Sequence, residues 1–251
     1  MSSIAIALIV FGCVFGGALL GTFLRTVLPE HHLSAESKNI VELGMGLVAT
    51  MAALVLGLMI ASAQGSFGTQ RSEFIQMSSN TILLDRALAS YGPETKEVRD
   101  LIRRVVLRTL NQIWPEDSSQ SAQLDPLVAR SEFVFEKIGA LAPQNDAQRS
   151  IKDQALSLAL NLAQTRWLMF EETGSSIPMP FLVVLVFWIT IIFVSFGLLA
   201  PPNATIIATL FICALSVSGA IFLILELDRP FRGLIQISSA PLRDALAHLG
   251  Q

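Results

Sequence analysis

The residues best placed to do chemistry share one face of the uncharged stretch Leu43–Ala63 and its continuation. At about 100° per residue, small and polar side chains gather on one side of a helical wheel. Such side chains are poorly matched to lipid and indicate contact with protein or water. In an assembly they would line a path for ions, with a carboxylate at one end and a guanidinium at the other. The candidate lining residues are Glu42, Gly46, Thr50, Ala53, Gly57, Gln64 and Arg71.

The opposite side of this stretch supports a second interpretation of the same helix. It is filled by leucine and methionine, and Leu54 and Leu58 lie one turn apart on it. If this side faced the axis of an assembly, the two leucines would form a gate that excludes water. A ring of Glu42 carboxylates would favour cations, whereas a ring of Arg71 guanidinium groups would favour anions. The residues therefore leave the ion selectivity open.

Four apolar stretches indicate an integral membrane protein. Hydrophobic residues make up 52% of the chain, charged residues 15%, and the mean hydropathy is +0.59, which is outside the usual range of soluble domains. Stretches of about 20 apolar residues can cross a hydrocarbon layer of about 30 Å. The predicted spans are Ile4–Leu24, Leu43–Ala63, Phe181–Ala200 and Ala204–Leu225.

The polar region between the second and third spans has the pattern of a helical bundle. Amphipathic helical patterns recur through it, with breaks at Gly92-Pro93 and Trp114-Pro115, and no strand pattern is present. On one of these helices four arginines crowd the polar side, which indicates either a solvated face or the lining of an anion route. They are Arg99, Arg103, Arg104 and Arg108.

The predicted fold class is all-α, with four transmembrane helices and a cytosolic helical bundle inserted between the second and third. Residues 1–63 form the first transmembrane pair and residues 64–177 the cytosolic domain. Residues 178–228 form the second pair, and residues 229–251 a cytosolic tail with a short amphipathic helix.

Two smaller patterns concern the ends and faces of the spans. The glycine pairs Gly12/Gly16 and Gly17/Gly21 have the spacing that permits close approach of membrane helices. After the fourth span, charges of alternating sign predict ion pairs that anchor the helix end at the membrane boundary. These residues are Glu226, Asp228, Arg229 and Arg232.

Several classes of function are disfavoured. The chain has no P-loop, no dinucleotide-binding glycine motif and no HExxH or GxSxG sequence, so an enzyme is not expected. No cofactor or metal site is predicted, and a net charge of −3 lacks the basic excess of a nucleic-acid-binding protein. Four spans without an inverted repeat also argue against a secondary transporter.

The distribution of positive charge predicts that both termini face the cytoplasm. With that orientation, all 17 lysines and arginines except Arg25 and Lys38 lie inside. Lysine and arginine close to membrane spans favour the cytoplasmic side.

Four stretches carry a resemblance to a known family. They are LVLGLMIASAQGSF (54–67), LLDRALASYGPE (83–94), the Trp114-Pro115 pair, and LLAPPNATIIATLFICALSVSGAIFLILELDRPFRGLIQISSAPLRDAL (198–246). The chain resembles the bacterial bestrophin-like membrane proteins, and more remotely the bestrophins. The resemblance implies a homopentamer in the bacterial inner membrane that conducts small inorganic ions, with anions slightly preferred, through a pore lined by the second span.

Two features of the animal bestrophins have no counterpart in this sequence. One is the acidic run that binds calcium, and the other is the aromatic neck, where Thr50, Leu54 and Leu58 offer no phenylalanine. Two functions therefore stand side by side. One is an oligomeric ion channel, and the other is a non-conducting membrane scaffold or sensor whose cytosolic bundle binds a partner.

Overall fold

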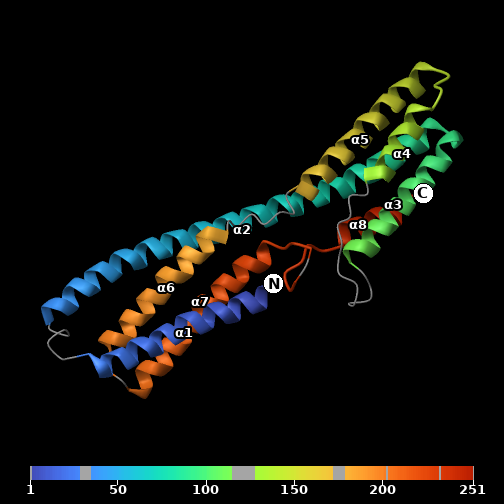
Figure 1. The fold of residues 1–251 in the computed structure, drawn as a ribbon. Helices are drawn as coiled ribbons and strands as arrows, with labels where there is room; N and C mark the ends of the chain where they lie inside the picture. The colour runs from blue at the N-terminus through green and yellow to red at the C-terminus, as the bar shows by residue number, and fades with distance from the viewer. Residues whose placement is uncertain are drawn as a thin grey trace. The chain divides into compact units, whose positions relative to one another are not determined.

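A computed structural model describes residues 2–28, 35–114, 128–171, 179–201, 203–231 and 233–250 (Figure 1). These residues form helices and no strand. Four of the helices are long and apolar enough to cross a membrane, which confirms the four predicted spans. The elements are α1 Ser3–Val27, α2 Ala35–Tyr91, the short 3-10 helix η2 Pro93–Thr95, α3 Lys96–Ile113, α4 Val128–Gly139, α5 Asp146–Glu171, α6 Met179–Leu199, α7 Ala204–Leu227 and α8 Ala240–His248.

Helix α2 continues without a break for 57 residues. It contains no proline, so nothing removes a backbone hydrogen bond along it. The helix stops at Gly92, whose φ of +144° lies in a region that disfavours any side chain. Pro93 then opens η2, and the buried Thr95 hydroxyl donates to the carbonyl oxygens of Leu88 at 2.6 Å and Gly92 at 2.8 Å. The predicted break at Gly92-Pro93 is confirmed.

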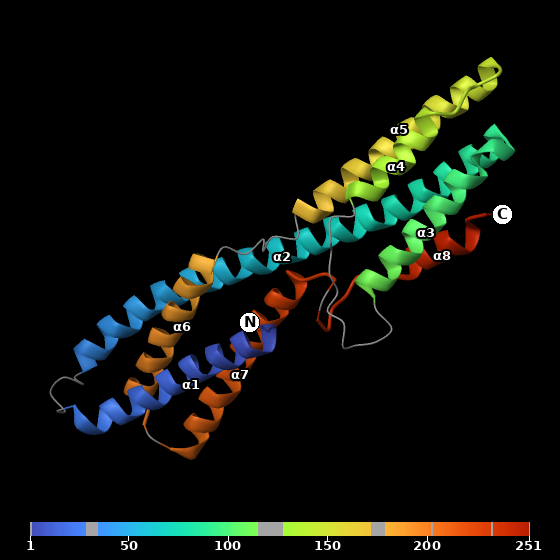
Figure 2. The same ribbon diagram turned by 45° about the vertical axis from the view of Figure 1, so that its right-hand side comes forward.

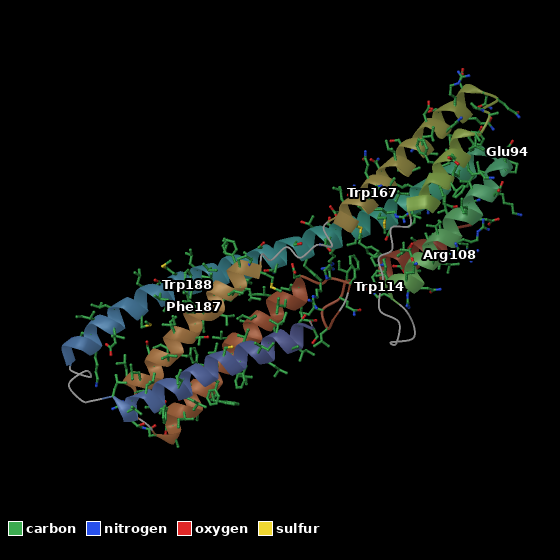
Figure 3. All side chains as sticks on the ribbon, in the orientation of Figure 1. Glu94, Arg108, Trp114, Trp167, Phe187 and Trp188 are labelled. Carbon is green, nitrogen blue, oxygen red and sulfur yellow. The ribbon has the colours of Figure 1, made fainter. Side chains whose placement is uncertain are left out.

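The chain divides into two compact units, each with its own hydrophobic core. The first, the apolar unit, comprises residues 1–66 and 175–228. The second, the polar unit, comprises residues 67–174 and 229–251. Side chains of α3, α4 and α5 end largely in nitrogen and oxygen, whereas those of α1, α6 and α7 are mostly carbon (Figure 3).

Within the apolar unit, α6 and α7 run alongside α1 (Figures 1 and 2). The contact between α1 and α6 depends on glycine. A Cβ at Gly21 would overlap the Val194 carbonyl, and a Cβ at Gly197 would overlap the Ala18 carbonyl. A Cβ at Gly17 would lie 3.0 Å from the Thr190 side chain. The close approach predicted for Gly17 and Gly21 is thus made with α6.

Polar groups complete the helix ends of the apolar unit. Arg25 donates from Nη1 to the Leu199 carbonyl at 3.0 Å and so satisfies a terminal acceptor of α6. The Asn203 side chain accepts from the Ile206 N–H at 2.9 Å and caps the start of α7. Each bond satisfies one terminal backbone group of an apolar helix.

The core of the polar unit is built from α3, α4, α5, α8 and the part of α2 after Ser66. Apolar side chains at helical spacing on α3 enter it, including Val98, Ile102 and Val106. Phe74, Trp114 and Phe231 form one aromatic cluster, with ring centroids 5.2 to 6.3 Å apart. Trp114 Nε1 also donates to the Ile237 carbonyl at 3.1 Å, which ties the segment after α7 to the end of α3.

Candidate functional site

The side of α2 that packs inside the apolar unit lies between the two faces distinguished on the helical wheel. Ala52, Met59 and Ala63 are buried in the unit's core. Ala49 and Val55 pack against that core and are half-buried. On the helical wheel Val55 and Met59 fall on the leucine-rich side, but in the structure both side chains contact the core of the apolar unit.

The outward side of α2 carries both sets of candidate residues. All seven predicted lining residues are exposed, and so are both predicted gate leucines, with Leu54 75% and Leu58 68% exposed. At about 100° per residue, Leu43, Thr50, Leu54 and Ala61 lie directly opposite the buried side. On one side of these four residues lie small and polar residues, and on the other side lie the remaining leucines. The residues on the first side are Gly46, Ala53, Gly57 and Gln64.

The glycines of α2 are not used for packing within the chain. A Cβ added to Gly44, Gly46, Gly57, Gly65 or Gly68 would have no neighbour within 4 Å. Only 11% of the most apolar part of α2 is buried, against 22% to 39% in the other three spans. This helix therefore has the largest surface that its own chain does not cover.

The polar side chains on this surface have distinct partners. The Thr50 hydroxyl donates to the Leu47 carbonyl at 2.7 Å, so its oxygen remains an acceptor towards the outside. Glu42 borders a hollow of about 520 Å³ between α2, α6 and α7. Ser195, which is 7% exposed, and Phe196 also line this hollow. These two residues could not be predicted from the sequence, because their position depends on how α6 packs.

The boundary residues after α7 lie in different environments. Glu226 is 4% exposed, Asp228 is half-buried and Arg229 is exposed. Arg232 lies outside the described residues. The predicted ion pairs among these four residues stay a prediction.

The arginine-rich side of α3 divides into two parts. Arg99 forms a bidentate pair with the Asp85 carboxylate, with both nitrogen–oxygen distances 2.8 Å. This hydrogen bond to Asp85 raises the pKa of the Arg99 guanidinium. Arg103, Arg104 and Arg108 are exposed. One of the four arginines therefore has a structural partner that the sequence did not reveal.

Comparison with known proteins decides the family. The family model of the bestrophin-like domain matches residues 12–242. The chain belongs to the bestrophin-like family. A mutant of a bacterial bestrophin homologue from Klebsiella pneumoniae has the same fold, with a TM-score of 0.65 at 14% sequence identity. The match covers 94% of this chain and 97% of that one. No curated protein matches the sequence.

Bestrophin-like membership fits the features described above. Family and fold together indicate, in general terms, an ion channel in a membrane. Among the described residues, no group of three or more histidine, cysteine, aspartate or glutamate side chains lies close enough to hold a metal ion.

Proposed function

We propose that this bestrophin-like chain assembles into an ion channel whose pore is lined by the outward side of α2. The observation that carries the proposal is a span whose predicted lining residues are all exposed and whose glycines have open space where a Cβ would be. A glycine or threonine that faces lipid contributes little favourable transfer free energy. In an assembly, the same residue permits close approach of a neighbouring helix or contact with water.

The proposed lining runs from Glu42 at one mouth to Arg71 at the other. Gly46, Thr50 and Gly57 line the middle, and Leu54 forms the main barrier because it lies at the centre of the outward side and is 75% exposed. A ring of leucines in a narrow passage excludes water and ions until it widens. The two sequence interpretations then describe one surface, with small residues beside a hydrophobic constriction.

The assembly and topology follow the family resemblance. The proposed channel is a homopentamer in the bacterial inner membrane, with both termini and the polar unit in the cytoplasm. The proposal is supported by the concentration of lysine and arginine in residues 64–177 and after residue 228. Labelling of single cysteines at positions 39 and 149 in intact spheroplasts tests the topology. The reagent should reach position 39 from outside and position 149 only after lysis.

Cysteine accessibility in the membrane tests the lining. Cys13 and Cys213 are first replaced by alanine, and T50C, L54C and G57C are then treated with a charged thiol reagent in liposomes. We expect these positions to react and reaction to alter flux. Leu8 on α1 is 65% exposed but is proposed to face lipid, so L8C is the matched control and should not react. Equal reactivity of L8C and T50C would contradict the proposed lining.

Flux through the purified protein tests conduction itself. Liposomes containing the protein should pass chloride or potassium faster than empty vesicles, and the reversal potential in a salt gradient gives the selectivity. The resemblance favours anions. E42Q should shift the reversal potential towards anions and R71Q towards cations, since each removes one ring of charge. Flux no greater than in empty vesicles would instead favour the scaffold or sensor.

A further inference from the structure

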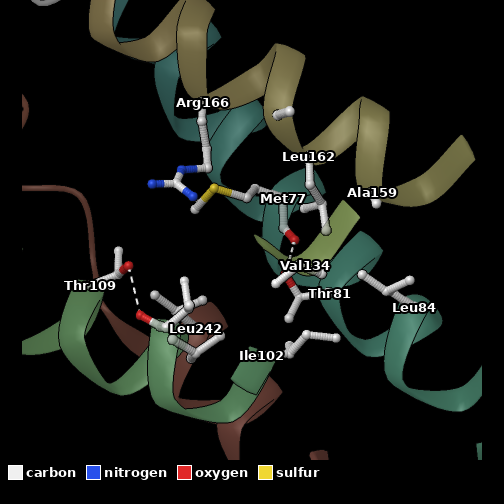
Figure 4. A pocket seen from close by; sticks show the side chains of 13 residues that line it. Met77, Thr81, Leu84, Ile102, Thr109, Val134, Ala159, Leu162, Arg166 and Leu242 are labelled. Carbon is white, nitrogen blue, oxygen red and sulfur yellow. Dashed lines mark hydrogen bonds between the residues drawn. The ribbon is translucent and has the colours of Figure 1, made fainter. Parts of the chain in front are cut away.

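The polar unit contains a cavity that the proposed channel does not use. Its volume is about 90 Å³, and α2, α3, α4, α5 and α8 all contribute to its wall (Figure 4). Leu84, Ile102, Val134, Ala159 and Leu242 are among the residues that form its apolar lining. Five helices thus converge on a small space without filling it.

The hydroxyl groups of this cavity are committed to their own helices. Thr81 donates to the Met77 carbonyl at 2.8 Å, and Thr109 donates to the Val105 carbonyl at 2.9 Å. Neither hydroxyl has a second proton to donate. Recognition of an anionic group in the cavity therefore depends on another side chain, one with protons left to donate.

That side chain is Arg166, which carries the only charge among the described residues of the lining. It extends from α5 along the side of the cavity where Met77 lies (Figure 4). Arg166 makes no hydrogen bond or ion pair with any residue in the described parts of the chain. Burial lowers the pKa of its guanidinium, and no nearby carboxylate offsets that effect.

The isolation of Arg166 contrasts with the two other half-buried arginines in the described parts of the chain. Arg99 is paired with Asp85 through two hydrogen bonds, and Arg25 donates to the Leu199 carbonyl. A cation held against apolar surface is unfavourable unless an anion or hydrogen-bond acceptors compensate it. Arg166 beside an apolar cavity therefore presents one half of a binding site for an amphiphilic anion.

We propose that this cavity binds a short aliphatic carboxylate, with the carbon chain in the cavity and the carboxylate on the Arg166 guanidinium. The planar guanidinium can donate two parallel hydrogen bonds to a carboxylate. The proposal does not depend on conduction, since the site lies entirely within the polar unit.

The size of the cavity sets the length of the ligand. An apolar cavity of about 150 Å³ accommodates benzene, with its six carbons. At the same packing, about 90 Å³ accommodates roughly four carbons. Pentanoate, whose carbon chain beyond the carboxylate has that length, is therefore the probe of choice. Acetate is too short to fill the cavity and decanoate is too long to be enclosed by it.

The experiment measures thermal unfolding of the full-length protein in lipid nanodiscs, at constant ionic strength, with sodium acetate, pentanoate or decanoate, and with 1-pentanol as the uncharged analogue. We expect pentanoate to raise the unfolding midpoint saturably by about 2 °C or more, and the other compounds to have little effect. Arg166→Gln should weaken the apparent affinity for pentanoate at least tenfold, because it removes the charged partner.

Two further variants complete the test. Arg149→Gln removes an exposed arginine from the same helix and should leave the response to pentanoate unchanged. Ala159→Leu fills the cavity and should abolish the response while Arg166 is kept. Absence of a saturable effect of pentanoate on the wild type would overturn the proposal, as would an unchanged affinity in R166Q. A stronger effect of decanoate would assign the site to long acyl chains instead and would overturn the proposed size.

Discussion

The buried ion pair between α2 and α3 gives a quantitative test of how the polar unit is held together. Asp85 accepts from Arg99 Nε and Nη2, both at 2.8 Å, and from the Gly250 N–H at 3.2 Å. One carboxylate thus connects α2, α3 and the end of the chain. The two side chains differ in their access to water, since that of Asp85 is 3% exposed and that of Arg99 is 20% exposed.

This difference in exposure predicts that loss of Arg99 lowers the folding stability more than loss of Asp85. Removal of one partner of a buried pair costs about 3–5 kcal/mol, because the other charge is left uncompensated. In Asp85→Ala the remaining Arg99 is one-fifth exposed and recovers some hydration, so we expect about 2–3 kcal/mol. In Arg99→Ala the nearly inaccessible Asp85 carboxylate retains only the hydrogen bond from the Gly250 N–H. We therefore expect a loss of about 3–5 kcal/mol in folding stability.

The test compares the thermal unfolding midpoints of the two variants, monitored by circular dichroism. For a chain of this size, 1 kcal/mol corresponds to a shift of about 2–4 °C in the midpoint. The double variant should lose less stability than the two single losses added together, because no charge remains unpaired. Arg149→Ala, which breaks an exposed pair with Asp146, is the control and should shift the midpoint little. A midpoint for R99A equal to or above that of D85A, or simple additivity in the double variant, would refute the reasoning.

Three further predictions concern both units. Gly21→Ala should destabilise the protein by about 1–3 kcal/mol or more through overlap with the α6 backbone, whereas Gly16→Ala, with open space for a Cβ, should be tolerated in the same unfolding measurement. The hydrogen bond from Lys137 at 2.7 Å lowers the pKa of the Glu97 carboxyl. Its contribution to stability is therefore present above the ordinary pKa of glutamate and is lost as the pH falls through the lowered value; the unfolding midpoints of wild type and Glu97→Gln should converge at that acidic pH. Leu54→Ser should raise ion flux in liposomes severalfold by wetting the proposed barrier, and unchanged flux would exclude Leu54 as the barrier.

Hydrophobic length and helix-breaking residues made the overall fold predictable. Three of the four apolar stretches are helices with ends within a few residues of the prediction, as for Ile4–Leu24 within α1, whereas Leu43–Ala63 is one part of the much longer α2. The break at Gly92-Pro93 follows from backbone conformation alone, which is a local property. Asn203 could have been read as a helix cap, and in the structure it is one.

Features that depend on partners distant in sequence were not predictable. Asp85 and Arg99 lie 14 positions apart, and on a helical wheel Arg99 resembles its exposed neighbours Arg103 and Arg104. The packed side of α2 was missed for a similar reason. A wheel sorts residues by polarity, whereas burial of Ala52 and Met59 is set by the shape of the helices that they meet.

The glycines of the apolar unit fall into two groups, those packed against another helix and those with open space where a Cβ would be. Where α1 meets α6, each helix occupies the space that a Cβ on the other would need, as at Gly17, Gly21 and Gly197. In α2, Gly46 and Gly57 have no such neighbour, although a leucine there would gain more from lipid than a glycine does. Glycine also weakens a helix relative to alanine by about 1 kcal/mol. Gly12 and Gly16 on α1 and Gly219 on α7 have open space as well, but only the outward side of α2 combines such glycines with the small and polar residues of the proposed lining. The proposed assembly around an axis would supply a neighbouring helix or a water-filled space on that side.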